Sequence, residues 1–143
     1  MLPVMLTIVL TAHDQERLRY LGVATVYLFG SHATGTAGPR SDYDVGILMQ
    51  PGVPTPERLD ATYDRLYALL ADRFPRTLEN DVIDIVFLER APLELRTHVV
   101  RYGILLFDER PRERVRFEEQ TLAAYRDYFP LLRELDRAIL ASV

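Results

Sequence analysis

The chain has 143 residues, which suits one ordinary domain and is too short for two comfortable ones. Its formal charge of −4 argues against a general nucleic-acid coat, and its 48% hydrophobic content is that of a globular domain. It contains no cysteine, and all 17 of its basic residues are arginines. These absences exclude a disulfide framework, a thiol nucleophile, a P-loop lysine and a Schiff-base lysine.

No stretch approaches the roughly twenty apolar residues that a membrane span requires. The apolar start, residues 1–10, lacks a basic segment and a small-residue cleavage site, so we expect a buried helix or strand and a cytoplasmic protein. The histidines His13, His32 and His98 have no metal-ligand spacing. If the chain is an enzyme, carboxylates must carry most of its chemistry.

The first half of the chain predicts one helix and two strands. Thr11 is a helix cap with Asp14 three residues later, and Gly22 ends the predicted helix. The β-branched and aromatic run 23–29 predicts a buried strand, and residues 42–49 predict a second. The glycine-containing segment 30–41 between them is expected to be a loop with one helical turn at most.

The second half alternates helices and strands. Thr55 and Pro56 predict the start of a helix that reaches Arg73. The remaining expected elements are a strand over 82–88, a helix from 92 to 103, a short strand over 104–107, and helical segments from 112 that are interrupted near Pro130. This order predicts an α/β (α+β) fold: one domain spanning 1–143, with a small mixed sheet, flanking helices and a helical tail from about 110 to 143.

Two carboxylates stand on the second predicted strand. Side chains alternate along a strand, so Asp42 and Asp44 point to one face, with β-carbons about 6–7 Å apart, while Tyr43 packs on the other. Two acids at this distance suit magnesium, which prefers oxygen ligands and completes its shell with water and phosphate. The alternative is a pair of solvated acids on an edge strand.

The turn before these acids has the chemistry of a phosphate cradle. Gly30 ends an apolar strand, and the hydroxyl and backbone N–H groups at Ser31 suit a phosphate. Gly35 and Gly38 allow the loop to fold back toward Asp42. An ordinary glycine-rich hairpin loop is the alternative.

A third acid, Asp84, is embedded in the hydrophobic run 82–88. A buried carboxylate is costly unless it is paired or bound to a metal, so we expect a buried third ligand here. The alternative is a core acid that is satisfied by an arginine or a backbone donor.

These motifs resemble a known family. The runs Phe29-Gly30-Ser31, Ser41-Asp42-Tyr43-Asp44-Val45 and Ile83-Asp84-Ile85 resemble the minimal nucleotidyltransferases of the polymerase-β-like superfamily. The tail, with Ala91-Pro92-Leu93, Arg101-Tyr102-Gly103 and Tyr125-Arg126-Asp127, is similar to MNT antitoxins that pair with HEPN ribonuclease toxins. The resemblance covers residues 23–128 and implies a polymerase-β-like nucleotidyltransferase fold.

The resemblance also implies roles for the site residues. Gly30 and Ser31 would hold the triphosphate of ATP. Asp42 and Asp44 would bind two magnesium ions, and Asp84 would contact the catalytic metal and help deprotonate the attacking hydroxyl. The implied activity is AMP transfer to a tyrosine of a HEPN toxin, which is held in a hetero-oligomer without direct contact to nucleic acid or membrane.

Two family arginines are replaced in this chain, by Thr34 and Gly38, and Arg40 is the candidate substitute as a phosphate clamp. The acids are intact, so these departures bear on turnover more than on metal binding. Two other functions stay open: a small-molecule nucleotidyltransferase of the aminoglycoside-modifying kind, and an antitoxin that neutralises its toxin by binding alone.

Overall fold

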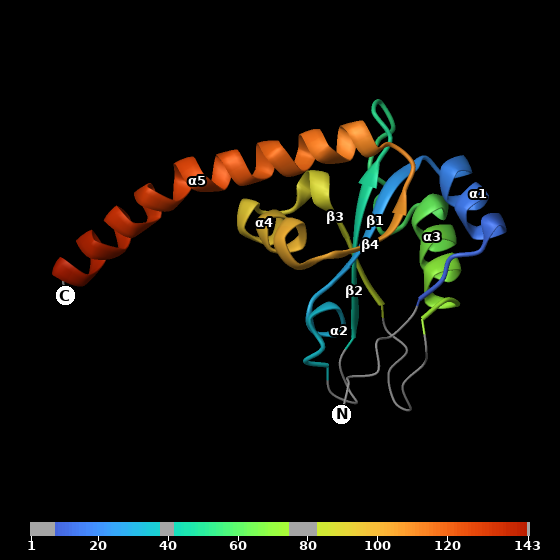
Figure 1. Ribbon diagram of the computed structural model, residues 1–143, viewed down its shortest axis with the longest axis horizontal. Coiled ribbons are helices and arrows are strands. Elements are labelled where there is room, and N and C mark those ends of the chain that lie inside the picture. Colours follow the sequence, from blue (N-terminus) through green and yellow to red (C-terminus); the bar gives the residue numbers. More distant parts are fainter. Residues whose placement is uncertain (1–7, 38–41, 75–82, 143) are drawn as a thin grey trace.

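The protein is a mixed sheet with helices on both faces. The computed structural model describes residues 8–37, 42–74 and 83–142. In this part, the strand order is β3-β2-β1-β4 (Figure 1). The strands are β1 (Val23–Phe29), β2 (Tyr43–Met49), β3 (Ile83–Phe87) and β4 (Ile104–Asp108). β1 pairs antiparallel with both β2 and β4, whereas β2 and β3 run parallel, which confirms the predicted mixed sheet.

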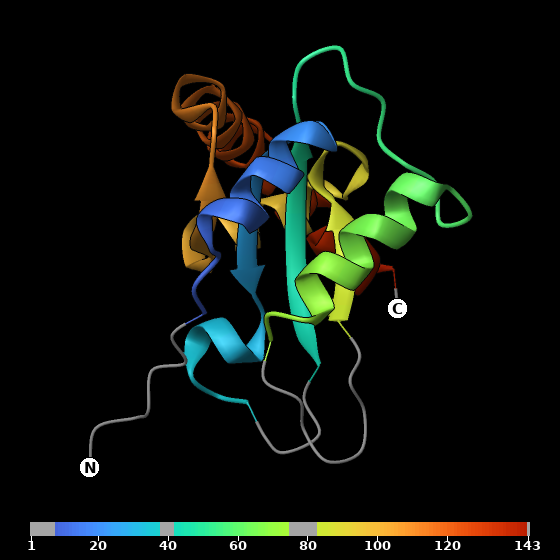
Figure 2. The ribbon, with the colours of Figure 1, turned by 90° about the vertical axis from the view of Figure 1, so that its right-hand side faces the viewer.

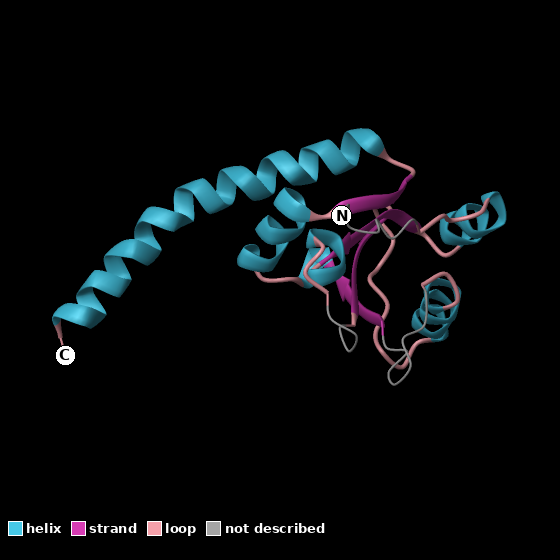
Figure 3. Cartoon of the chain, turned by 60° about the horizontal axis from the view of Figure 1, so that its bottom comes forward, coloured by secondary structure: helices cyan, strands magenta, loops and turns pink. Residues whose placement is uncertain are grey.

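The helices form two layers. α1 (Ala12–Tyr20) and α3 (Ala61–Ala71) lie side by side on one face of the sheet, as Figure 2 shows. α4 (Leu93–Tyr102) and α5 (Pro111–Ala141) lie on the other face, where α5 runs past α4 and away from the sheet (Figure 3). Two short pieces complete the described chain: α2 (Ser31–Thr34) directly after β1, and the single turn η1 (Leu88–Arg90) after β3.

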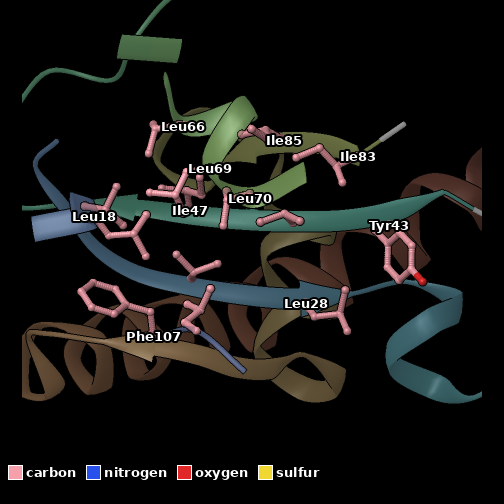
Figure 4. Packing of buried hydrophobic residues seen from close by; sticks show 14 of the residues in the cluster. Leu18, Leu28, Tyr43, Ile47, Leu66, Leu69, Leu70, Ile83, Ile85 and Phe107 are labelled. Carbon is pink, nitrogen blue, oxygen red and sulfur yellow. The ribbon is translucent and has the colours of Figure 1, made fainter. Parts of the chain in front are cut away.

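The central strands are buried on both faces because each face has its own apolar cluster. Toward α1 and α3, Leu28 and Ile47 pack with Leu18 and Leu66 (Figure 4). Toward α4, the alternate residues of β1 join the second cluster, which consists of Tyr27, Phe29, Leu48, Leu88 and Val99. A strand between two helical layers needs a continuous apolar run, and 23–29 has one.

The first helix begins as its sequence predicts. The Thr11 hydroxyl accepts a hydrogen bond from the backbone N–H of Asp14 at 3.1 Å, and the Asp14 carboxylate accepts one from the N–H of Thr11 at 2.9 Å. This reciprocal pair is a capping box. Asp14 is almost fully buried, and the guanidinium of Arg73 pairs with its carboxylate at 2.8 Å. The pair ties the start of α1 to the segment that follows α3.

The helix predicted to begin at Thr55 and Pro56 begins later, at Ala61, so that prediction was wrong at its start. The Thr55 carbonyl accepts a hydrogen bond from Arg90 at 3.1 Å, and the Glu57 carboxylate pairs with the same guanidinium at 2.8 Å. These tertiary contacts hold residues 55–57 outside the helix. Leu59, which precedes the observed helix, is 96% exposed.

The predicted interruption near Pro130 is also wrong, because α5 is one helix from Pro111 to Ala141 with Pro130 inside it. A proline inside a helix removes one backbone hydrogen bond and crowds the preceding turn, which usually kinks or ends the helix. Here Pro130 is exposed, so water can satisfy the freed carbonyl. The helix curves along its length (Figure 1).

A half-buried polar network anchors the first turns of α5 to the sheet. The Arg114 guanidinium pairs with Asp108 at 2.8 Å and with Glu118 at 3.0 Å. Glu118 also accepts a hydrogen bond of 2.7 Å from the Tyr27 hydroxyl. Burial, together with the Glu118 carboxylate, raises the pKa of that hydroxyl, so it remains a proton donor.

We expect Arg114→Ala to lower the free energy of unfolding by about 1–3 kcal/mol, because it leaves two half-buried carboxylates without their cation. Arg112 lies two residues earlier, on the exposed face of α5, and is the matched control. Arg112→Ala should change the free energy of unfolding by no more than about 0.5 kcal/mol. Urea unfolding of both variants measures the difference, and equal stabilities would contradict the anchoring role of Arg114.

No helix in residues 8–37, 42–74 and 83–142 is both long enough and apolar enough to cross a membrane.

Candidate functional site

The predicted acids meet at one end of the sheet. β1 finishes there at Phe29, and its antiparallel neighbour β2 and the parallel strand β3 both begin there. Phe29 lies opposite Asp44, and Asp44 lies opposite Asp84. Residues paired in this way share a face, and neighbouring strands lie about 4.8 Å apart. The fold therefore places Gly30, Asp44 and Asp84 side by side although 54 positions separate the first from the last.

Asp44 is the half-buried acid at the centre. Burial raises the pKa of its carboxyl above the ordinary value, and the carboxylates of Asp84 and Asp42 raise it further. Asp42 is exposed and precedes the first residue of β2. Asp42 and Asp84 therefore both repel the Asp44 carboxylate, and a cation beside Asp44 would relieve that repulsion.

Asp84 corrects one expectation: it is exposed, not buried. In β3 the buried side chains are those of Ile83, Ile85 and Phe87, and Asp84 lies on the opposite face. β3 is an edge strand, and the helix α4 covers this face only further along the sheet. Asp84 lies at the site because the parallel pairing of β3 with β2 places it opposite Asp44. It is not a core acid that needs a compensating charge.

Gly30 makes the closest approach to the acids. Its φ is 75° with ψ −157°, a conformation that is nearly restricted to glycine. A β-carbon at this position would collide with Oδ2 of Asp44. The Gly30 carbonyl accepts hydrogen bonds from the backbone N–H groups of Ala33 and Thr34 at 3.1 and 3.2 Å, which turns the chain into α2. The turn thus brings the Gly30 backbone into close contact with the Asp44 carboxylate.

Of the other residues predicted to contact the nucleotide, the structure describes Ser31 but not Arg40. Ser31 is half-exposed at the start of α2, and its hydroxyl makes no hydrogen bond with the described residues. The Thr34 hydroxyl lies 2.9 Å from the Thr36 hydroxyl within the loop. Arg40 and Gly38 lie outside the described residues.

The turn at Gly30, the three acids and all four described strands lie within the part of the chain that a family comparison matches. Residues 15–112 match the family described as polymerase beta, nucleotidyltransferase. The chain belongs to this family. The nucleotidyltransferase fold expected from the sequence is therefore confirmed.

Solved structures similar to this nucleotidyltransferase include chains from toxin–antitoxin complexes. A chain of a toxin–antitoxin crystal structure with AMP-PNP is 26% identical, with a TM-score of 0.62 over 94% of this chain and 98% of that chain. A chain from the complex of tri-AMPylated Shewanella oneidensis HEPN toxin with MNT antitoxin is 23% identical, with a TM-score of 0.55 over 92% and 96%. A chain of the MntA–HepT toxin–antitoxin is 24% identical, with a TM-score of 0.53 over 93% and 98%. The last two show the fold alone. No curated protein matches this chain.

Two histidines lie near the acids, and sequence reasoning did not place one of them, His98, there. Both His32 on α2 and His98 on α4 counteract the raised pKa of Asp44, so both lie within its electrostatic reach. His32 stacks on Tyr43 with ring centroids 3.8 Å apart, and His98 meets Phe29 edge-on at 6.5 Å. His98 comes near the acids because α4 packs on the sheet, and no sequence motif or spacing predicts this position.

The donor set fits a magnesium–phosphate complex better than a metal held by protein alone. In the described part of the nucleotidyltransferase, no group of three or more acidic or histidine side chains is arranged to hold a metal ion. Magnesium commonly binds to one or two carboxylates and takes its remaining ligands from water and substrate phosphates. The paired Asp44 and Asp84 supply two carboxylates at adjacent strand positions, which matches that division of ligands.

We expect Asp44→Asn to stabilise the ligand-free protein by about 0.5–2 kcal/mol at neutral pH, because it removes a half-buried charge that two acids repel. The raised pKa means that the folded protein holds this proton more tightly than the unfolded chain. The cost of ionisation is therefore full above the folded pKa and absent below the unfolded value of about 3.9. Urea unfolding at neutral pH and below pH 4 measures the gain, which should vanish in acid. A destabilised variant at neutral pH would contradict the strained-acid interpretation.

Proposed function

We propose that this chain is the antitoxin of a HEPN/MNT toxin–antitoxin pair and transfers AMP from Mg-ATP to a tyrosine hydroxyl of its cognate HEPN ribonuclease toxin. The observation that carries the proposal is the parallel register of Asp44 and Asp84, with the Gly30 backbone against the Asp44 carboxylate. The family resemblance implies that acids placed in this way would serve a metal-bound triphosphate.

Each site residue has a role in this proposal. Gly30 and Ser31 hold the triphosphate, with Arg40 as a further phosphate contact. Asp42, Asp44 and Asp84 would hold two magnesium ions, whose remaining ligands would be water and phosphate oxygens. Bound magnesium neutralises phosphate charge and stabilises the attacking and leaving oxygens of an in-line displacement.

The transfer itself exchanges a phosphoanhydride bond for a phosphate ester bond. The tyrosine oxygen forms a bond to the α-phosphorus of ATP. The bond from that phosphorus to the oxygen bridging to the β-phosphate breaks, and pyrophosphate leaves with the electron pair. The tyrosine proton passes to the carboxylate of Asp84, which is exposed at the sheet edge and accessible to an incoming hydroxyl.

The solved structures support a protein acceptor and an adenine nucleotide. One similar chain was solved as a toxin–antitoxin with AMP-PNP, and another with a tri-AMPylated HEPN toxin. Both alignments cover more than nine tenths of this chain, so they extend beyond the nucleotide-binding core. The chain would act in the cytoplasm, where ATP and the toxin meet, in a hetero-oligomer and as a single domain with α5 as its tail.

Transfer of label from ATP tests this function. The chain is incubated with magnesium, with ATP labelled at the α- or the γ-phosphate, and with its cognate HEPN protein, which we expect the neighbouring reading frame to encode. We expect tyrosine to gain label from α-labelled ATP and none from γ-labelled ATP, since pyrophosphate leaves. If no tyrosine is labelled, the transfer proposal is wrong, and labelling of an aminoglycoside instead would favour a small-molecule acceptor.

A further inference from the structure

The second half of α5 carries an apolar surface that the described chain leaves uncovered. Apolar side chains recur every three or four residues on one side of the helix, and we call them the α5 stripe: Tyr125, Tyr128, Leu132, Leu135 and Ile139. Tyr128 is 40% exposed, Ile139 53% and Leu135 57%. This spacing is that of a helix that packs against other helices.

The α5 stripe continues the face by which α5 packs on its own domain. Earlier in the helix, Arg114, Phe117 and Thr121 contact the sheet and α4, and they are spaced by three and four residues. The same periodicity leads from Thr121 to Tyr125 and on to Ile139. Past α4 the helix extends away from the rest of the domain, as Figure 1 shows. The face that packs on the domain in the first half of α5 is therefore uncovered by the described chain in the second half. Residues 125–141 extend over about 25 Å of helix.

Charge and width indicate what covers this face. The polar residues of the second half are balanced, with three arginines and three acids: Arg126, Asp127, Arg133, Glu134, Asp136 and Arg137. A helix for lipid surfaces or nucleic acid would carry a basic face instead. Phe129 and Leu131 flank the stripe and are 43% and 61% exposed. An apolar face of this width suits a groove between helices of a protein more than a single partner helix in a coiled coil.

The stripe begins beside α4, the helix that also carries His98 near Asp44. The Arg101 guanidinium of α4 lies over the Tyr125 ring, 5.1 Å from its centroid. His98, which lies three residues before Arg101, faces Phe29 and the Asp44 carboxylate. A hollow of about 790 Å³, lined by Arg101, Tyr125 and Phe129 among others, lies along the same junction. A protein seated on the stripe therefore has neighbouring segments at the nucleotide site.

We infer that the α5 stripe is the docking surface for the protein acceptor, which contacts it through an apolar groove between its own helices. The inference rests on the proposed function for the identity of that acceptor. The alignment with the AMP-PNP toxin–antitoxin chain leaves 6% of this chain unmatched, which is less than the second half of α5. Most of the stripe therefore has a counterpart in a chain that was solved as part of a toxin–antitoxin pair.

A matched pair of leucines tests the stripe. Leu135 lies on it, whereas Leu140 is 74% exposed and lies outside it on the same helix. We expect Leu135→Glu to weaken binding of the neighbouring HEPN protein at least tenfold and Leu140→Glu to leave it within about twofold. Binding is measured by interferometry in the absence of ATP, so it does not depend on transfer. Circular dichroism checks that both variants keep the helix.

The other outcomes separate this inference from the proposed function. If Leu135→Glu binds and labels the HEPN protein as the unsubstituted chain does, the stripe is not the docking surface although transfer stands. If the unsubstituted chain binds but transfers no AMP, and Leu135→Glu loses binding, the surface stands and the transfer fails. Light scattering is measured on each protein alone. A dimer that Leu135→Glu converts to monomer, with HEPN binding unchanged, would overturn the inference in favour of a second copy of this chain.

Discussion

Replacing Asp42 and Asp44 together by asparagine should abolish AMP transfer, with a loss of about 10³-fold or more, and leave binding of the HEPN protein unchanged. The substitution keeps the size of both side chains and removes the charges that would hold magnesium against the triphosphate. Metal ions supply several kcal/mol of charge stabilisation in such reactions, and each 1.4 kcal/mol changes a rate about tenfold. The α5 stripe, where we place the acceptor, is untouched.

The measurement pairs the initial rate of tyrosine labelling with the dissociation constant for the HEPN protein. Asp64→Asn combined with Asp72→Asn is the matched control, since both are exposed acids of the α3 region and the change in charge is the same. This control should label at the unsubstituted rate. Cells protected from the toxin as well by the Asp42/Asp44 double variant as by the unsubstituted chain would show that binding alone neutralises the toxin.

The strand-borne part of the site could be predicted because it depends on local patterns. The run 23–29 is apolar throughout, and a strand buried on both faces needs no other signal. Alternation along β2 separates Asp44 from Tyr43, and Tyr43 indeed packs in the core beside Phe74. A turn with glycine at a strand end predicts positive φ, and Gly30 has it.

The misjudged features depend on contacts between segments distant in the sequence. Asp84 was expected to be buried because its neighbours are apolar, yet an edge strand exposes one face where no helix covers it. The helix expected from Thr55 is delayed by contacts to Arg90, 35 positions away. His98 reaches Asp44 only through the packing of α4 on β1. Periodicity and local propensity carry no information about such pairings.

In the proposed mechanism, the exposed Asp84 and the half-buried Asp44 have different roles. Asp44 lies between the strand neighbours Phe29 and Asp84, where a charge is costly until a cation compensates it. Asp84 is at the open side, where an acceptor hydroxyl can approach. A charge placed for ligand binding lowers the stability of the ligand-free protein. We therefore expect Asp44→Asn to stabilise the protein while it weakens magnesium binding.

Gly30→Ala should be the most damaging single substitution, lowering the free energy of unfolding by about 2–4 kcal/mol and transfer by about 100-fold or more. Part of the cost is conformational, since the φ of 75° and ψ of −157° suit glycine alone. The rest is steric, because the new β-carbon collides with Asp44 Oδ2. Displacing a metal-binding carboxylate by even 1 Å can lower a rate about 100-fold.

Gly52→Ala is the control that separates the conformational cost of a β-carbon at positive φ from the steric cost of the collision with Asp44. Gly52 also has a positive φ, 81°, but a β-carbon there meets nothing within 4 Å, and it follows the opposite end of β2. It should lose about 1–2 kcal/mol of stability and keep full transfer activity. Thermal unfolding with and without Mg-ATP gives a readout even if Gly30→Ala is marginally stable. Nucleotide should raise the melting temperature of Gly52→Ala as it does for the unsubstituted chain, and should leave that of Gly30→Ala unchanged. A Gly30→Ala protein that Mg-ATP still stabilises fully would mean that the triphosphate binds away from this turn.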